Sequence, residues 1–216
     1  MTYLSRVELN PYRRETIAAL SSPQMMHAAV MASFPSTGPI DGGRVLWRVD
    51  KVGVSTFLLI QSSTAPDLHH IVDQFGRPAT GQGWDSIDYD QFLDTIEDGQ
   101  TFRFRLKANP VHSIPGDGRG KVKAHVTVDQ QREWLTSRAE RNGFRIVQGG
   151  DGDSFDVVDR SIHRFRRGDS VVTLSMATYE GILEVTDRDT FVESLCNGIG
   201  RAKAYGCGML SIARVP

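Results

Sequence analysis

One histidine of the chain, His27, occupies a position suited to proton transfer. Ser22 and Pro23 predict the start of a helix shortly before it, because serine caps helices and proline fits their first turn. An imidazole has an ordinary pKa of about 6.5, so it gains or loses a proton near neutral pH, and a helix N-terminus lowers that pKa. The residues three, four and seven positions beyond His27 are apolar, which also fits a histidine that only flanks the core. If the chain is an enzyme, His27 is its expected general acid or base.

A second candidate site is the segment GIGRAKAYGCG, residues 198–208. Its glycines allow successive backbone N–H groups to point into one concavity, and Arg201 and Lys203 add positive charge, so the segment suits an anion such as phosphate. The alternative is a tight connection that needs glycine for positive φ. The segment precedes a predicted strand, which excludes a Walker loop and a dinucleotide fingerprint. Its glycines are Gly198, Gly200, Gly206 and Gly208.

Charged residues are segregated along the chain, although the net charge is only −1. Residues 84–98 carry acidic side chains and no basic ones, whereas TFRFRLKANP and RSIHRFRR are strongly basic. Such basic clusters create the local positive field that phosphate contacts require, while each cluster taken alone also fits an ordinary solvated face. The candidate cations are Arg103, Arg105, Lys107, Arg160, Arg164, Arg166 and Arg167.

No residues show the spacing of a metal or cofactor site. The other histidines lack metal-ligand spacing, and Cys196 and Cys207 lack the C-x-x-C pattern. We therefore predict no metal, no cofactor and no disulfide framework. RNA cleavage fits this inventory, because the 2′-OH of RNA is itself the nucleophile and the protein needs only a proton-transfer group, cations near the phosphate and a firm grip.

The elements that would position these residues form two similar halves. The first reads as a strand (YLSRVEL), a helical run from about Tyr12 to Phe34 with a break near Pro23, two strands (RVLWRV and STFLLIQS), a short helix ending at Gly76, and the strand TFRFRLKANP. Strict alternation in that last strand places its apolar residues on one face and its cations on the other. The loop chemistry of residues 111–120 then predicts a linker.

The second half repeats this order with one extra hairpin strand. KVKAHVTV and FRIVQ are predicted strands around the helix QQREWLTSRAERNG, followed by a long hairpin with a basic turn, a helix (RDTFVESLCNG) and a final strand (GMLSIARV). We predict an α+β protein of two tandem ferredoxin-like, RRM-like domains with antiparallel sheets, residues 1–110 and 121–216, joined by the linker 111–120. Apolar runs too short to span a bilayer and an N-terminus unlike a signal peptide predict a cytoplasmic protein.

Five segments together resemble the CasE family, the repeat-processing endoribonuclease of type I-E CRISPR systems. They are YLSRVELNP, SPQMMHAAVMASFP, FRLKANP, YEGILEVTD and GIGRAKAYGCGMLSIA, in order from residue 3 to residue 213. The glycine-rich segment is the most specific of them. The resemblance implies two ferredoxin-like domains that bind the hairpin of the CRISPR repeat RNA and cut it without metal, leaving a 2′,3′-cyclic phosphate. The enzyme would then stay bound to the 3′ hairpin with the other subunits of Cascade, and it would need no membrane or small-molecule cofactor.

The same resemblance implies roles for individual residues. The catalytic histidine falls on His27, a basic hairpin that enters the RNA major groove falls on residues 160–167, and the glycine-rich loop lies close to the RNA. Asn109 of FRLKANP joins the candidate RNA contacts. Some relatives carry a tyrosine three residues before the histidine, where this chain has Gln24, so the identity of the base that deprotonates the 2′-OH stays open.

Two other functions fit the residues as well. One is a non-catalytic RNA-binding subunit in which His27 only packs, and the other is an enzyme that binds a small phosphorylated ligand at residues 198–208. The several separate basic clusters favour a large polyanion over a small ligand, which would need only one of them.

Overall fold

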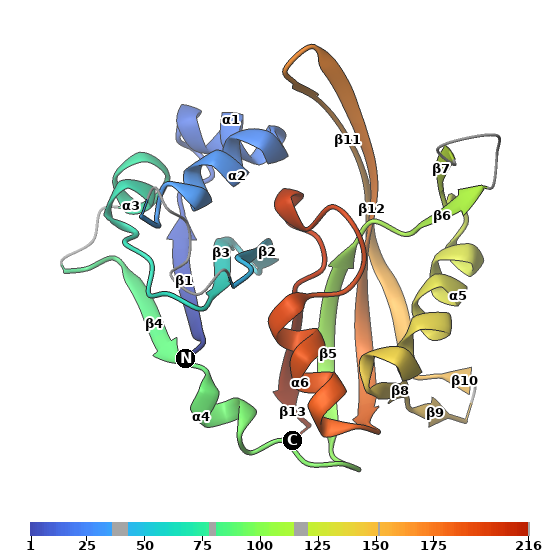
Figure 1. Ribbon diagram of the computed structural model, residues 1–216. Coiled ribbons are helices and arrows are strands. Elements are labelled where there is room, and N and C mark those ends of the chain that lie inside the picture. The colour runs from blue at the N-terminus through green and yellow to red at the C-terminus, as the bar shows by residue number, and fades with distance from the viewer. Residues whose placement is uncertain (36–42, 78–80, 115–120, 151, 216) are drawn as a thin grey trace. The chain divides into compact units, whose positions relative to one another are not determined.

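The computed structural model describes residues 1–35, 43–77, 81–114, 121–150 and 152–215 (Figure 1). The chain forms two compact units, each built from several stretches of sequence. The first comprises Met1–Thr95, Arg164–Val172 and Lys203–Gly206, and the second comprises Ile96–His163, Thr173–Ala202 and Cys207–Pro216. Each unit contains one large antiparallel sheet.

The first unit has a four-stranded sheet in the order β2-β3-β1-β4, which is the ferredoxin-like strand order. All neighbouring strands in it are antiparallel. Its elements are β1 (Tyr3–Leu9), α1 (Arg14–Ser21), α2 (Pro23–Met31), β2 (Leu46–Val52), β3 (Ser55–Ser62), α3 (His69–Phe75), β4 (Trp84–Asp88) and the short α4 (Asp90–Leu93).

The helices of the first unit pack on one face of its sheet. Met26 and Val30 of α2 are buried in one cluster with Leu58 of β3 and with residues of β1 and α3. The predicted cap is present: the Ser22 hydroxyl accepts a hydrogen bond from the Met25 amide at 3.4 Å, and Pro23 begins the helix. This capped start fixes which residues of α2 face the core.

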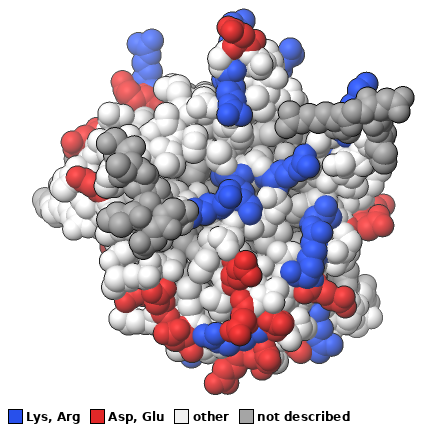
Figure 2. Space-filling model, in the orientation of Figure 1, with Lys and Arg blue, Asp and Glu red and all other residues white. Residues whose placement is uncertain are grey.

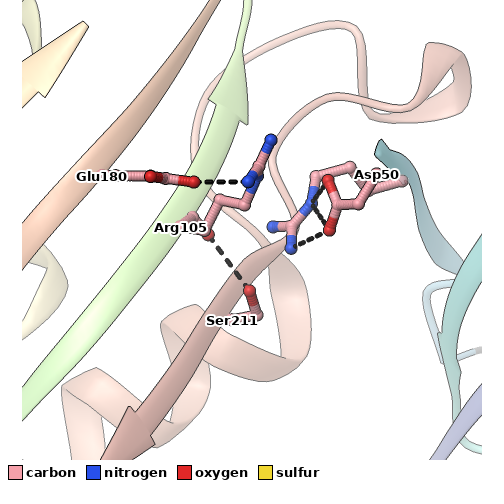
Figure 3. Close-up of polar contacts among 5 residues, drawn as sticks. Asp50, Arg105, Glu180 and Ser211 are labelled. Carbon is pink, nitrogen blue, oxygen red and sulfur yellow. Dashed lines mark hydrogen bonds and ion pairs between the residues drawn. The ribbon is translucent and has the colours of Figure 1, made fainter. Parts of the chain in front are cut away.

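The same sheet carries a buried ion pair. Arg48 of β2 is only 1% exposed, and its guanidinium binds the carboxylate of Asp50 with an Nη2–Oδ2 distance of 2.7 Å (Figure 3). A buried charge requires such a partner, because an isolated one costs far more free energy than folding supplies.

The second unit has a five-stranded sheet in the order β11-β12-β5-β13, with β8 also paired to β12. Two helices cover one face: Trp134 of α5 stacks with Tyr179 of β12, and Phe191 of α6 meets Phe144 of β8 edge to face. Its main elements are β5 (Thr101–Ala108), α5 (Val128–Ala139), β8 (Phe144–Ile146), β11 (Phe155–Arg167), β12 (Ser170–Val185), α6 (Arg188–Asn197) and β13 (Leu210–Arg214).

Shorter elements complete the chain. They are β6 (Val111–Ile114), β7 (Lys121–Ala124), β9 (Gln148–Gly149), β10 (Gly152–Asp153) and the 3-10 turns η1 (Glu140–Asn142) and η2 (Lys203–Tyr205). The strands β6 and β7 pair with each other, as do β9 and β10. None of the helices described is long and apolar enough to cross a membrane.

The predicted α+β fold with two antiparallel, ferredoxin-like sheets is confirmed, but one strand was assigned to the wrong half. Residues 101–108 form β5, the first strand of the second sheet, where they pair with β12 and β13. The fourth strand of the first sheet is β4, which lies within the acidic residues 84–98, where the sequence analysis places no strand, and which pairs with β1. Its acidic residues suit an edge strand, because charge on an exposed edge prevents further pairing.

The two compact units do not follow one another along the chain, because segments 164–172 and 203–206 belong to the first unit. The chain first leaves that unit between Thr95 and Ile96, whereas the sequence predicts a first domain of residues 1–110. Of the predicted linker, residues 111–114 are β6, and residues 115–120 lie outside the described residues. KVKAHVTV contributes only the short β7, which pairs with β6 and is not a strand of the large sheet.

Candidate active site

His27 lies in the second turn of α2 and is partly buried. Its Nδ1 is buried and has no hydrogen-bond partner in the described part of the chain. Burial lowers the pKa of the imidazole, and the nearby positive charge of Arg167 lowers it further. The neutral form is therefore favoured near neutral pH. The sequence predicts the same direction of shift from the helix N-terminus, but burial is the larger cause here.

Two aromatic rings pack in sequence beside the imidazole of His27. The ring of Tyr205 in η2 meets the imidazole edge to face, with 6.3 Å between centroids and 68° between planes. The ring of Phe165 in β11 meets Tyr205 in the same way, at 4.9 Å and 63°. All three residues belong to the first unit, although they are far apart in the sequence. We call them the His27–Tyr205–Phe165 ring series.

Positively charged side chains lie on the same elements as these rings. The turn η2 contacts both α2 and β2, and it carries Lys203 as well as Tyr205. Burial lowers the pKa of the Lys203 ammonium, and the charge of Arg44 lowers it further. Positive charges held close together in this way favour a bound anion, because each one disfavours the other until a negative charge arrives.

The end of the β11–β12 hairpin carries the predicted basic cluster. Arg164, Arg166 and Arg167 are exposed and make no ion pair with any carboxylate in the described ranges. Phe165 lies between them and is only 7% exposed, so alternation points its ring away from the face that carries Arg164 and Arg166. Arg160, further back on β11, donates a hydrogen bond to the Val126 carbonyl.

The glycine-rich segment is divided between the two units. Residues 203–206 belong to the first unit, and residues 198–202 and 207–208 belong to the second. Close packing explains why two of these positions are glycine. A Cβ on Gly200 would lie 3.0 Å from the Trp134 ring, and one on Gly206 would lie 2.7 Å from the Trp47 ring. Both have positive φ. These positions fit the tight-connection alternative, and an RNA contact by the segment stays a prediction.

Two other residues of the segment pair with β5 or with the residue that follows it. The Gly208 amide donates to the Lys107 carbonyl, and Arg201 forms an isolated bridge with Asn109. Gly198 ends α6, where its amide donates to the Ser194 carbonyl. The side chain of Asn109 is 7% exposed. Its predicted contact with RNA is untested, and its visible role is in this packing.

The cations of β5 lie on the face of the second sheet that the helices leave uncovered. As predicted, Phe102, Phe104 and Leu106 are buried on the other face. Arg105 forms an ion pair with Glu180 of β12, and its carbonyl accepts a hydrogen bond from the Ser211 hydroxyl at 3.4 Å (Figure 3). This face contains a hollow of about 520 Å³ whose lining includes Arg103, Arg105, Asp156 and Glu180. Carboxylates therefore partly offset its positive charge.

The face of the molecule drawn in Figure 2 carries both basic and acidic side chains, and they gather in separate groups. The near-zero net charge is thus an average over clusters of opposite sign, as the sequence predicts. Local charge balance, more than total charge, must decide which parts of this surface attract a polyanion.

Two further histidine environments are present in the second unit. The rings of His112 and His125 lie 4.7 Å apart, and burial, followed by the charge of His112, lowers the pKa of His125. Burial and then Lys107 lower the pKa of His163. Among the described residues, no three or more His, Cys, Asp or Glu side chains are arranged to hold a metal ion.

Sequence reasoning found His27, Lys203 and Arg167, which the structure brings into one unit. It missed Tyr205, Phe165 and Arg44. Tyr205 lies within the glycine-rich segment that was singled out, so its position offered a signal, but a ring contact between residues so distant in sequence leaves no local pattern. Arg103, Arg105 and Lys107 lie in the second unit, on a sheet face of mixed charge.

Comparisons with known proteins give this geometry its context. The chain is 27% identical over 219 residues to the CRISPR-associated endoribonuclease Cse3 of Thermus thermophilus, covering 98% of this chain and 99% of that one. It is 27% identical over 175 residues to the CRISPR system Cascade subunit CasE of Escherichia coli, covering 77% of this chain and 84% of that one.

A solved structure of Thermus thermophilus Cse3, bound to an RNA that represents a pre-cleavage complex, matches with a TM-score of 0.81 and 28% identity, covering 98% of each chain. The Cas6e structure from Escherichia coli has the same fold, with a TM-score of 0.66 and 21% identity. The model of the family described as "CRISPR associated protein" matches residues 2–214, and the chain belongs to that family.

Proposed function

We propose that the protein is a metal-independent endoribonuclease that binds the stem-loop of a CRISPR repeat RNA and cleaves it, with His27 as the proton-transfer group. The observation that carries this proposal is the partly buried His27, with its lowered pKa, in the same unit as Arg167 and Lys203. Membership of the CRISPR associated protein family supports it, as does the similarity to an endoribonuclease over nearly the full chain.

The chemistry follows from the residues present. The 2′-OH of the RNA gives its proton to His27 and its oxygen attacks the adjacent phosphorus. The P–O5′ bond breaks, and the 5′-oxygen leaves as a hydroxyl after taking up a proton from water. The products are a 2′,3′-cyclic phosphate and a 5′-hydroxyl. Because its lowered pKa keeps His27 neutral, the imidazole is ready to accept the 2′-OH proton. With Nδ1 buried, we assign this transfer to Nε2.

Cations stabilise the extra negative charge of the pentavalent phosphate. The charge of Arg167 acts on His27, which makes it a candidate for this role, and Lys203 lies on the turn that also carries Tyr205. Lys203 is partly buried, and a positive group held in such a site stabilises the transition state more than it would in water, since little reorganisation is needed as the charge develops.

RNA binding is assigned to the predicted basic and glycine-rich positions. The exposed arginines at the end of the β11–β12 hairpin are the leading group, because they form no ion pair with a described carboxylate. The full proposed set is Arg103, Arg105, Lys107, Asn109, Arg160, Arg164, Arg166, Arg167, Gly198, Gly200, Arg201, Lys203, Gly206 and Gly208. After cleavage we expect the protein to stay on the 3′ hairpin with other Cascade subunits, in the cytoplasm. The E. coli relative is named a Cascade subunit.

A cleavage assay tests the proposal. Wild type, His27→Ala and His69→Ala are incubated with a repeat stem-loop RNA in EDTA, and with the same RNA carrying one 2′-deoxy nucleotide at the cut. We expect wild type and His69→Ala to cleave, and His27→Ala to lose about 10²-fold to 10⁴-fold in rate. His69 is a matched control because its side chain is 74% exposed.

Three outcomes would contradict the mechanism: cleavage that persists in His27→Ala, cleavage of the 2′-deoxy RNA, or loss of cleavage in EDTA that returns with a divalent ion. Tight binding by the wild type without any cleavage would identify a non-catalytic RNA-binding subunit.

A further inference from the structure

His27 has a packing neighbour, Tyr205, on the ring series, but it has no hydrogen-bond partner at Nδ1 among the described residues. Catalytic imidazoles are commonly oriented by a carboxylate or carbonyl that binds the nitrogen not used in proton transfer. In this protein Nδ1 of His27 is buried and makes no such bond within the described ranges. The contact that remains is the edge-to-face packing of Tyr205, at a centroid distance typical of favourable aromatic pairs.

Tyr205 is itself held in place from two sides. Its own turn η2 contacts α2 and β2, and the following residue, Gly206, lies so close to the buried Trp47 that a Cβ would meet the ring at 2.7 Å. On the other side, the ring of Phe165 meets it at 4.9 Å. Tyr205 is therefore packed between the core of the first unit and the hairpin end.

Phe165 links this packing to the proposed RNA surface. It is buried, whereas its neighbours Arg164 and Arg166 are exposed on the opposite face of the same strand. Because neighbouring residues of one strand share its backbone, an RNA that fixes the arginines also fixes the position of the Phe165 ring.

We propose that Phe165 and Tyr205 are positioning residues that orient His27, so that RNA bound at the end of the β11–β12 hairpin aligns the imidazole for proton transfer. This inference rests on the proposed endoribonuclease function and adds to it a coupling between recognition and cleavage. It also gives the glycine-rich segment a second purpose, since that segment delivers Tyr205 to the histidine. The ring of Tyr205 does the positioning, and its hydroxyl is dispensable.

Single-turnover cleavage by four variants tests the proposal. Tyr205→Phe keeps the ring and should cleave within about threefold of wild type. Tyr205→Leu and Phe165→Leu should each cleave about 10-fold to 100-fold more slowly at saturating RNA, because small displacements of a catalytic group are costly. The double variant should be no more than about threefold slower than the slower single variant, since both substitutions break the same connection. Tyr12→Leu removes a tyrosine that is 85% exposed and should leave the rate unchanged.

The dissociation constant for the RNA, measured with a 2′-deoxy substrate, should change by less than about threefold in all of these variants. The proposal is overturned if Tyr205→Leu cleaves at the wild-type rate, if Tyr205→Phe is as slow as Tyr205→Leu, or if the losses multiply in the double variant. A loss of rate explained entirely by weaker binding would also overturn it.

A readout without cleavage separates this inference from the proposed function. The His27 imidazole is titrated by NMR in the RNA-free protein, for wild type, Tyr205→Leu and Tyr12→Leu. Removing the ring of Tyr205 exposes the imidazole to water, so the pKa should rise toward its ordinary value in Tyr205→Leu alone. An unchanged titration would contradict the ring contact even if His27 proves catalytic. A changed titration in a protein that does not cleave would leave the contact standing and refute the enzyme assignment.

Discussion

The hairpin end and the open face of the second sheet both carry arginines that the sequence marks as RNA contacts, yet their surroundings differ. At the hairpin end, Arg164 and Arg166 are exposed and unpaired with any described carboxylate. On the sheet face, Arg105 is paired with Glu180, and Asp156 lines the same hollow. The local balance of charge therefore decides which basic residues are ready to bind phosphate, because a paired cation must first give up its partner.

The two regions also differ in how their backbones are held. The hairpin end packs with a turn that ends at Gly206, where only glycine fits against Trp47. The sheet face is a regular ladder in which β5 pairs with β12 and β13. A change of one atom should therefore be felt strongly in the first region and weakly in the second.

The largest expected effect is on stability. Gly206→Ala introduces a Cβ at positive φ and against a buried ring, so the free energy of unfolding should fall by about 3 kcal/mol. Ser211→Ala removes one long hydrogen bond on the sheet face and should cost about 0.5 kcal/mol. Urea denaturation of both variants measures the difference, and equal losses would remove the distinction between the regions.

Next comes RNA affinity. Arg164→Ala combined with Arg166→Ala should weaken binding of the repeat stem-loop by about tenfold at moderate salt, and the slope of log K against log salt should become shallower by about one per arginine. Fluorescence anisotropy at several salt concentrations gives both values. An unchanged slope would place these arginines away from the phosphates.

A smaller effect concerns pH. Proton acceptance requires neutral His27, so the cleavage rate should fall as pH decreases through the pKa of His27, which lies below its ordinary value. Arg167→Ala removes a charge that disfavours the imidazolium, so that pKa should rise and the acidic limb of the pH–rate profile should move to higher pH. A limb that stays in place, or moves to lower pH, would show that Arg167 does not act on His27.

The smallest effect is expected on the sheet face. Arg105→Ala should change RNA affinity by less than about twofold, because the ion pair with Glu180 already offsets its charge. Glu180→Gln should tighten binding by about twofold, since it leaves the guanidinium without that partner. If Arg105→Ala weakens binding as much as the hairpin variants do, charge balance is the wrong criterion for choosing contacts.

Local patterns predicted most of the fold. The capped start of α2, the alternation in β5 and the long basic hairpin all depend on neighbouring residues, and the structure has each of them. The assignment of β5 and β4 to their sheets failed because strand pairing is a long-range choice. Charge on β4 also hid its strand character, as expected at a sheet edge.

The candidate site shows the same difference between local patterns, which the sequence reveals, and long-range contacts, which it does not. His27 was found from its place on a helix, and Lys203 and Arg167 from their clusters. Tyr205 and Phe165 were missed because edge-to-face packing between residues so far apart in the chain has no sequence periodicity. Their roles rest on tertiary contacts that only a structure reveals.

The first unit is assembled from three separate stretches, and the last of them ends at Gly206, ten residues before the end of the chain. A ribosome must therefore have translated past residue 205 before Tyr205 and Lys203 exist to join His27. A nascent or truncated polypeptide that stops within the second unit contains the histidine without its companions. Cleavage is thus expected only after residues 203–206 have been translated and packed, so shorter translation products are expected to leave cellular RNA uncut.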